Sequence, residues 1–143
     1  MANAKAANPK VKRKRSTSMA KAKPEIDIAR VYDAPAPDGR FRVLVDRLWP
    51  RGVKKEDLKL NAWMKQLAPS AELRHWFNHD PRRWGEFRCR YCEELKAKPD
   101  ELAQLLEVAE KQSVLLLYGA RDKEHNNAVA LKEFLEKHRS RRA

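Results

Sequence analysis

The sequence lacks several features that would place it in a specialised class of protein. No apolar run approaches the roughly 18 residues of a membrane-spanning helix, and the N-terminus has no apolar stretch like that of a signal peptide. Two cysteines in 143 residues do not form a disulfide framework. We therefore predict a cytoplasmic protein in a reducing compartment, with no membrane partner.

Motifs that would identify a reaction are also missing. The chain has no Gly-rich phosphate loop, no complete catalytic triad, and no helix-turn-helix, zinc-finger or aromatic-basic RNA motif. Cys89 and Cys92 form a single C-x-x-C pair in the middle of an expected helix, where ordinary helix residues are favoured over a zinc or redox site. His75 and His79 are four residues apart, but no Glu follows the first His as in a metalloprotease helix. We predict no metal and no cofactor.

The basic charge of the chain is concentrated at its two ends. The formal net charge is +12, and residues 1–23 hold eight Lys and Arg with no acid, while residues 139–143 hold three arginines. Residues 24–138 hold 21 basic and 20 acidic residues, so this part is almost neutral. The charge therefore predicts basic tails on a neutral domain, and not a basic domain that binds nucleic acid.

The first segment, residues 1–23, offers little apolar surface. It has no aromatic residue, and its larger apolar side chains are Met1, Val11 and Met19. Such a composition does not offset the entropy of ordering a chain, so we predict a disordered basic tail. Translation from Met19 is an open alternative, in which the first 18 residues do not belong to the working protein.

The remaining sequence predicts one small α/β domain, residues 24–138, followed by a basic C-terminal tail, 139–143. Strands are expected at 26–32, 41–46 and 113–120, with a weaker extended segment at 62–69 and a loop with one helical turn at 50–61. Helices are expected after the N-cap Ser70, after Asp80-Pro81, at 100–111 and at about 126–138. This order favours a mainly parallel sheet flanked by helices, with 41–46 and 113–118 as central strands.

Side chains of the expected core follow the helical periodicity. They are Trp84, Phe87, Tyr91 and Leu95 on the second helix, Leu102, Leu105, Leu106 and Ala109 on the third, and Val129, Ala130, Leu131, Phe134 and Leu135 on the last. Trp63, Trp76 and Trp84 have apolar neighbours, which favours core packing over base stacking. Trp49 is left open between a pocket wall and ordinary burial.

Polar residues follow two of the expected central strands at the point where each strand ends. Asp46 and Arg47 follow the strand 41–46, and a polar run from Tyr118 to Asn127 follows the strand 113–118. In open α/β sheets, ligands bind beyond the carboxyl ends of the strands. If the two strands are parallel neighbours, both polar groups share one edge of the sheet and form a binding site there.

The residue types in this region favour an anionic ligand. Guanidinium groups match phosphate and carboxylate, and the N-terminus of the last helix favours an anion. We predict Asp46 and His125 as acid and base, and seven ligand-binding residues, which are Arg47, Trp49, Arg51, Tyr118, Arg121, Asp122 and Asn126. The alternative for each is structural, in which Asp46 pairs with an arginine and Asp122 or Asn126 only caps a helix.

Five stretches resemble one protein family. They are "RVYD", "RVLVDRLWPRG", "LAPS-x-ELR-x-WF", "HDPRRWGEFRCRYCEEL" and "LLLYGARDKEHNNAVAL", spanning about residues 28–137. Together they resemble the YeaO-like family, domain of unknown function 488. The resemblance implies a small cytosolic α/β domain, mainly bacterial, without an established activity. The residues that it places on the family pattern, without a role, are Asp46, Arg47, Trp49, Arg51, His79, Asp80, Trp84, Tyr118, Asp122, His125 and Asn126.

One departure from the broader family bears on mechanism. That group often carries a cysteine after the last central strand and a Cys-His-Arg-like run at the following helix, as the resemblance implies. Tyr118 and the run "EHNNA" stand in those regions here. This difference argues against cysteine chemistry in this protein.

Two functions of different classes follow from the sequence. The first is an enzyme or binder of a small anionic, phosphate- or nucleotide-like ligand, with a pocket at the carboxyl ends of the central strands. The alternative is a nucleic-acid-associated or regulatory protein that acts through its basic tails, with weak, non-specific binding through residues 5–23. A third possibility is a scaffold that binds only another protein, and the sequence does not indicate the oligomeric state.

Overall fold

A four-stranded parallel sheet organises the computed structural model, which describes residues 24–142. Its strands are β2 (Ile26–Arg30), β3 (Phe41–Leu44), β4 (Ala62–Trp63) and β5 (Val114–Tyr118), arranged in the order β2-β5-β3-β4. The expected central pair, β3 and β5, are parallel neighbours, with Phe41 beside Val114 and Leu44 beside Leu117. The α/β fold predicted from the sequence is therefore confirmed, while the predicted tail at 1–23 lies outside the described residues.

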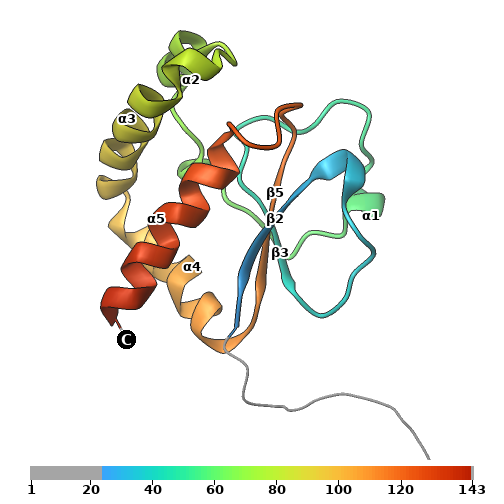
Figure 1. The fold of residues 1–143 in the computed structure, drawn as a ribbon. Helices are drawn as coiled ribbons and strands as arrows, with labels where there is room; N and C mark the ends of the chain where they lie inside the picture. The colour runs from blue at the N-terminus through green and yellow to red at the C-terminus, as the bar shows by residue number, and fades with distance from the viewer. Residues whose placement is uncertain (1–23, 143) are drawn as a thin grey trace, which may run out of the picture.

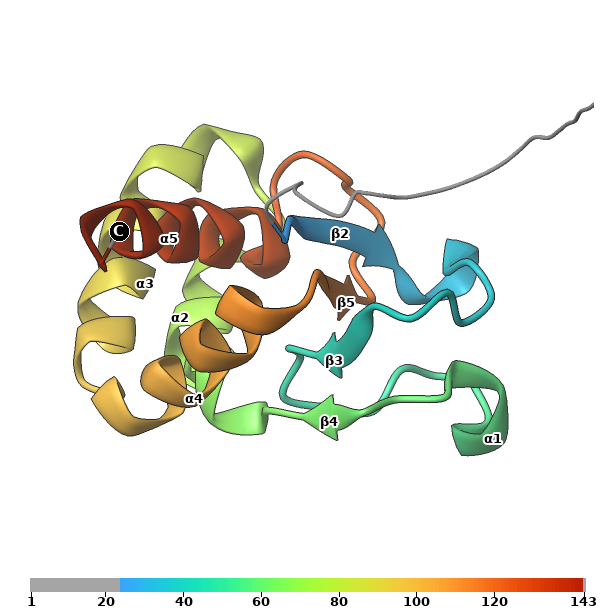
Figure 2. The ribbon, with the colours of Figure 1, turned by 90° about the horizontal axis from the view of Figure 1, so that it is seen from below.

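Four helices lie on one side of the sheet, and the last of them packs directly on β2 and β5, as Figures 1 and 2 show. They are α2 (Ala71–Phe77), α3 (Trp84–Lys96), α4 (Pro99–Lys111) and α5 (Asn127–Arg142). The opposite face is covered by the short helix α1 (Lys55–Leu58) and by loops. Within the described residues, no helix is both long enough and apolar enough to cross a bilayer.

The alternation of side chains along the strands produces two separate cores. Val43, Val114 and Leu116 belong to the core under the four helices. Leu44, Leu115 and Leu117 point to the other face and pack in a smaller core with Leu58 of α1. Because both of its faces are covered, β5 is buried at every position, as its continuous apolar sequence predicts.

The helix starts follow the capping residues of the sequence. The Ser70 side chain accepts a hydrogen bond from the Leu73 N–H at 3.0 Å and begins α2. Asp80 accepts from the Arg82 N–H at 3.0 Å, and Pro81 follows it. This second cap begins a short 3₁₀ turn, Pro81–Arg83, and α3 starts directly after it. Both predicted caps are therefore present.

A few boundaries differ from the sequence prediction. Residues 31–33 form a 3₁₀ turn in place of the end of the predicted strand. The weak segment 62–69 contains only the two-residue β4 and a 3₁₀ turn, Lys65–Leu67. The last helix continues to Arg142, past the predicted end at 138. Val129, which the sequence predicts in the core, is only half-buried. Its neighbour Ala128 is buried in its place.

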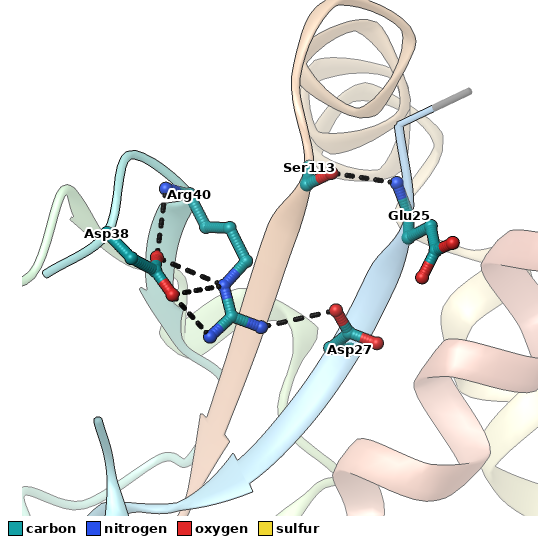
Figure 3. Close-up of polar contacts among 5 residues, drawn as sticks. All are labelled: Glu25, Asp27, Asp38, Arg40 and Ser113. Carbon is teal, nitrogen blue, oxygen red and sulfur yellow. Dashed lines mark hydrogen bonds and ion pairs between the residues drawn. The ribbon is translucent and has the colours of Figure 1, made fainter. Parts of the chain in front are cut away.

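The amino ends of the strands are tied together by polar contacts (Figure 3). The Arg40 guanidinium donates to Asp38 at 2.8 Å and to Asp27 of β2 at 3.2 Å. The Glu25 N–H donates to the Ser113 hydroxyl at 2.9 Å. The Arg40 hydrogen bond lowers the pKa of Asp38. These contacts hold the amino ends of β2, β3 and β5 together, at the edge of the sheet opposite the carboxyl ends.

Candidate functional site

A pocket of about 650 Å³ opens at the carboxyl ends of β3 and β5, where the sequence predicts a site. Its lining combines cationic and imidazole side chains, amides and an apolar wall. The lining residues are Asp46, Arg47, Leu48, Pro69, Ala71, Arg74, His75, Phe77, Asn78, His79, Phe87, Gly119, Ala120, His125, Asn126 and Asn127. The volume falls within the roughly 300–1,000 Å³ of small-molecule sites.

Asp46 joins the three segments that meet at the base of the pocket. Its Oδ2 accepts from the Gly119 N–H at 2.9 Å, and its Oδ1 accepts from the Asn127 side-chain amide at 3.1 Å. The same amide also donates to the Val45 carbonyl at 2.9 Å. Burial raises the pKa of Asp46, and the hydrogen bonds from Asn127 and Gly119 oppose this rise. Asp46 therefore connects the ends of β3 and β5 to the start of α5.

Two arginines line the pocket without a carboxylate partner. The Arg47 Nε and Nη2 donate to the Pro69 carbonyl at 3.4 and 3.3 Å, which are long contacts. Arg74 comes from α2. Within residues 24–139, neither guanidinium forms an ion pair, unlike Arg40 and Arg82, which pair with aspartates. Within residues 24–139 both guanidinium groups therefore lack a direct carboxylate contact, although the charge of Arg74 helps to lower the pKa of Asp46 against the rise caused by burial.

His125 is oriented by a carboxylate and by an aromatic ring. Its Nδ1 lies 2.9 Å from Asp122 Oδ2, and its ring meets the Trp84 ring edge-on, with 5.3 Å between centroids. The hydrogen bond from the Glu124 N–H is the largest cause that lowers the pKa of Asp122, and the His125 side chain is the second. Asp122 therefore holds one ring nitrogen of His125 and orients the ring at the pocket.

The wall opposite the strand ends comes from α2 and the turn that follows it. Ala71, Arg74, His75 and Asn78 recur at helical spacing, so that one face of α2 lies along the pocket. Asn78 and His79 both have positive φ angles, 49° and 53°. Such angles are uncommon outside glycine and recur at functional sites. This turn places the His79 side chain at the pocket.

Asn126 begins α5 and is fully engaged. Its Oδ1 accepts from the Val129 N–H at 3.0 Å, and its Nδ2 donates to the Asp122 carbonyl at 2.8 Å. The residue is 2% exposed. The side chain thus caps the helix and supports the turn that carries His125. The N-terminus of α5 itself lies against the pocket.

The lining residues contain no hydroxyl, thiol or primary amine. Cys89 and Cys92 lie in the middle of α3 and are free thiols. Among the residues that the structure describes, no group of three or more His, Cys, Asp or Glu side chains is arranged to hold a metal ion. The lining therefore offers guanidinium, imidazole, amide and carboxylate groups, without a side chain suited to covalent catalysis at a hydroxyl or thiol.

Four of the nine predicted site residues line the pocket, and a fifth supports it. Asp46, Arg47, His125 and Asn126 belong to the lining, and Asp122 orients His125 from behind. The polar residues that follow β3 and those that follow β5 therefore lie together at the carboxyl edge of the sheet, as the sequence predicts.

The other four lie outside the lining. Trp49 packs against Trp63 with 5.4 Å between ring centroids, and its Nε1 donates to the Val53 carbonyl, so it is a partly buried residue packed against the second core. Tyr118 is buried under the helices, where burial raises its pKa. Arg51 and Arg121 are exposed and do not reach the pocket.

Sequence reasoning missed the contribution of α2 and of Asn127. The sequence indicates His75 and His79 only as a disfavoured metal pair, with His79 also on the family pattern, and it gives Arg74 and Asn127 no role in ligand binding. The sequence shows that Ala71, Arg74 and His75 lie on one face of a helix. It does not show that this face of α2 lies along the pocket. That face is set by the contact of α2 with α3, where Phe77 and Phe87 stack with 4.4 Å between centroids.

Comparison with known proteins assigns the chain to a family. The model of the family described as the inactive DUF488-N3 subclade matches residues 25–143. The chain belongs to the YeaO-like DUF488 family. It is 42% identical over 110 residues to the uncharacterized protein YeaO of Escherichia coli (strain K12), across 77% of this chain and 96% of that protein. The resemblance seen in the sequence motifs is confirmed.

Mycobacterial members of the DUF488 family are similar at nearly the same level. The uncharacterized protein Rv3073c of Mycobacterium tuberculosis (strain H37Rv) is 40% identical over 110 residues, which cover 77% of this chain and 92% of that protein. The uncharacterized protein Mb3100c of Mycobacterium bovis has the same identity and coverage. No solved structure gives a significant match.

Proposed function

We propose that the protein reversibly binds a small anionic, phosphate- or nucleotide-like ligand in the pocket at the carboxyl ends of β3 and β5. One observation carries this proposal. Arg47 and Arg74 face the same pocket without an ion-pair partner within residues 24–139, and the one carboxylate of the lining, Asp46, already accepts two N–H donors. Unpaired guanidinium groups at a concave site favour a phosphate or carboxylate.

The shape of the pocket supports an organic anion over a bare inorganic one. A volume of about 650 Å³ is far larger than a phosphate group requires. The apolar part of the lining includes Leu48, Phe77 and Phe87, and Leu48 is 64% exposed at the rim. In this proposal the arginines hold the charged group, and the apolar wall accepts the rest of the ligand.

Binding is favoured over catalysis by two independent arguments. The family model that matches is described as inactive, and the lining lacks a hydroxyl, thiol or amine nucleophile. In this proposal Asp46 is an architectural acceptor, because both of its oxygens are engaged. His125, predicted from the sequence as an acid or base, serves in this proposal as a side chain that donates to the bound anion.

A thermal-shift titration of the full chain tests the proposal. The ligands are inorganic phosphate, pyrophosphate and nucleoside monophosphates, because a ligand that binds only the folded state raises Tm by mass action. We expect at least one to raise Tm, and the shift to be lost in Arg47→Ala and Arg74→Ala. Arg51→Ala is the matched control, since Arg51 is an exposed arginine of the same loop outside the lining. Equal shifts in all three variants would rule out this pocket.

The alternative function rests on the charge of the first segment. Residues 1–23 carry eight Lys and Arg and no acid, a pattern that binds phosphate backbones through counterion release. In this alternative, deletion of residues 1–23 abolishes retention of the protein on DNA and leaves anion-dependent Tm shifts unchanged. Arg74→Ala has the opposite effect if the pocket is the functional site. We also propose that the protein acts in the cytoplasm, whichever of the two functions it has.

A further inference from the structure

Three of the four histidines of the chain line the same pocket. They come from separate segments, with His75 on α2, His79 in the turn after it and His125 after β5. The fourth, His138, stacks on Phe134 in α5 and lies outside the lining. Histidine is the side chain that gains a proton between about pH 5 and 8. The pocket brings together three imidazole groups that are distant in sequence.

Charged groups lie around the same pocket on the elements that form it. Asp46 and Arg47 follow β3, Arg74 extends from α2, and Asp122 follows β5 and contacts His125 directly. Asp80, next to His79 in sequence, is already bonded to the guanidinium of Arg82.

The α3 side of His125 adds one more cation. Trp84 packs on the His125 ring, and the Arg88 guanidinium lies 5.7 Å from the centroid of the Trp84 ring. Among the groups around the pocket, only Asp122 contributes a carboxylate in contact with a lining imidazole. The arrangement thus provides few negative charges to compete with a bound anion for the imidazolium groups.

We propose that the pocket selects ligands that carry a doubly charged oxyanion group, such as phosphomonoesters, with sulfate and inorganic phosphate as minimal probes, and that it binds them with proton uptake by its histidines. This inference rests on the proposed function and specifies its ligand class and its regulation. Two guanidinium groups and up to three imidazolium groups exceed what a singly charged carboxylate or phosphodiester requires. A dianion with unesterified oxygens accepts more of these donors at once.

The sign of the pH effect follows from linkage. A bound dianion favours the charged form of each imidazole that faces it, so the complex holds more protons than the empty protein. Affinity therefore rises as pH falls and weakens as pH rises. One hydrogen bond converted from neutral to charged corresponds to roughly a tenfold change in Kd.

Calorimetric titration of the full chain with sodium sulfate measures this coupling. Sulfate stays doubly charged throughout, so any change reports protons of the protein. We expect Kd to fall about tenfold from about pH 8 to about pH 6. We also expect binding heats that differ between buffers of different ionisation enthalpy, which shows proton uptake. At about pH 8, where methyl phosphate is doubly charged, it should bind more tightly than dimethyl phosphate, which has the same core but a single charge.

Three histidine variants assign the protons. His125→Gln should reduce the pH dependence of Kd and the proton uptake. The double variant His75→Gln/His79→Gln should also reduce both quantities. His138→Gln is the matched control and should behave as the wild type, since His138 lies outside the lining.

The outcomes separate this inference from the proposed function. Sulfate binding with the same Kd at both pH values and without proton uptake would overturn the inference and leave an anion pocket in place. Equal affinity for methyl and dimethyl phosphate would overturn the selectivity for dianions. Absence of any anion binding at either pH would overturn both, provided that the far-ultraviolet circular dichroism shows a folded protein.

Discussion

The carboxylate of Asp46 accepts a hydrogen bond from the Gly119 N–H at 2.9 Å, although 73 residues separate the two in sequence. Asp46 follows β3, and Gly119 follows β5. Their contact exists because the two strands are parallel neighbours that end at the same edge of the sheet. The side-chain amide of Asn127 completes the junction from the first turn of α5. The pocket is built around this junction.

Replacement of Gly119 by alanine should weaken the junction. A Cβ at this position would lie 3.2 Å from Asp46 Oδ2, which is closer than ordinary contact. We expect Gly119→Ala to cost about 1–2 kcal/mol of unfolding free energy in urea denaturation, through a forced shift of the carboxylate. Gly85→Ala, in α3 with open space around the new Cβ, should gain about 0.5–1 kcal/mol. The idea fails if both variants are stabilised equally.

The pH dependence of stability should reveal the burial of Asp46. Its pKa is raised in the folded state, mainly by burial of the carboxylate, so the folded protein holds this proton more tightly than the unfolded chain. The contribution of Asp46 is therefore largest below the unfolded pKa and declines as pH rises through the folded pKa. Asn does not titrate and leaves a donor unpaired, so Asp46→Asn is destabilising. This loss should shrink from about pH 3.5 to about pH 7.

Asp122 should show the opposite trend. Its pKa is lowered by the Glu124 N–H and then by the His125 side chain. Stability from this group is present above the unfolded pKa and is lost as pH falls through the folded pKa. The destabilisation caused by Asp122→Asn should therefore grow as pH rises from about 3 to about 5, and chemical denaturation across this range measures it. The effect is small, because a third of the side chain is exposed. A loss that is constant with pH would contradict it.

Ser70 should affect both stability and the pocket, because it fixes the start of α2. Its hydroxyl accepts from the Leu73 N–H at 3.0 Å and donates to Glu94 at 2.6 Å. We expect Ser70→Ala to cost about 1–2 kcal/mol in urea denaturation and to weaken anion binding several-fold, since α2 carries Arg74.

Ser113→Ala provides the comparison for this test. Its hydroxyl also accepts a backbone N–H, from Glu25 at 2.9 Å, but at the amino end of the sheet (Figure 3). Anion affinity should be unchanged in Ser113→Ala. Equal losses of affinity in the two variants would mean that the α2 cap has no specific link to the pocket.

The sheet and the place of the site were predictable, because local patterns determine both. A fully apolar run from Val114 to Leu117 indicates a strand covered on both faces, and a strand of that kind has parallel neighbours. The rule that ligands bind at the carboxyl ends of such strands then points to Asp46 and His125. Both lie in the pocket that the structure forms.

Residues whose position depends on tertiary packing could not be placed. Trp49 and Arg51 are close to Asp46 in sequence, but the chain turns after Leu48, so that Trp49 packs beneath the opposite face of the sheet on Trp63. Arg74 is distant in sequence and enters the site because α2 stacks on α3. Proximity in sequence to a strand end is therefore a weaker guide than the face that a neighbouring helix presents.

The central claim is that an anion binds at the junction of β3, β5 and α5. A ¹H–¹⁵N correlation spectrum of the full chain, titrated with inorganic phosphate, tests it most directly. The account predicts saturable shifts of the Gly119, Asn126 and Asn127 backbone amides and of the His125 ring, with β4 and α4 unaffected. Shifts confined to residues 1–23, with those amides unchanged, would contradict the claim and identify the basic tail as the site of binding.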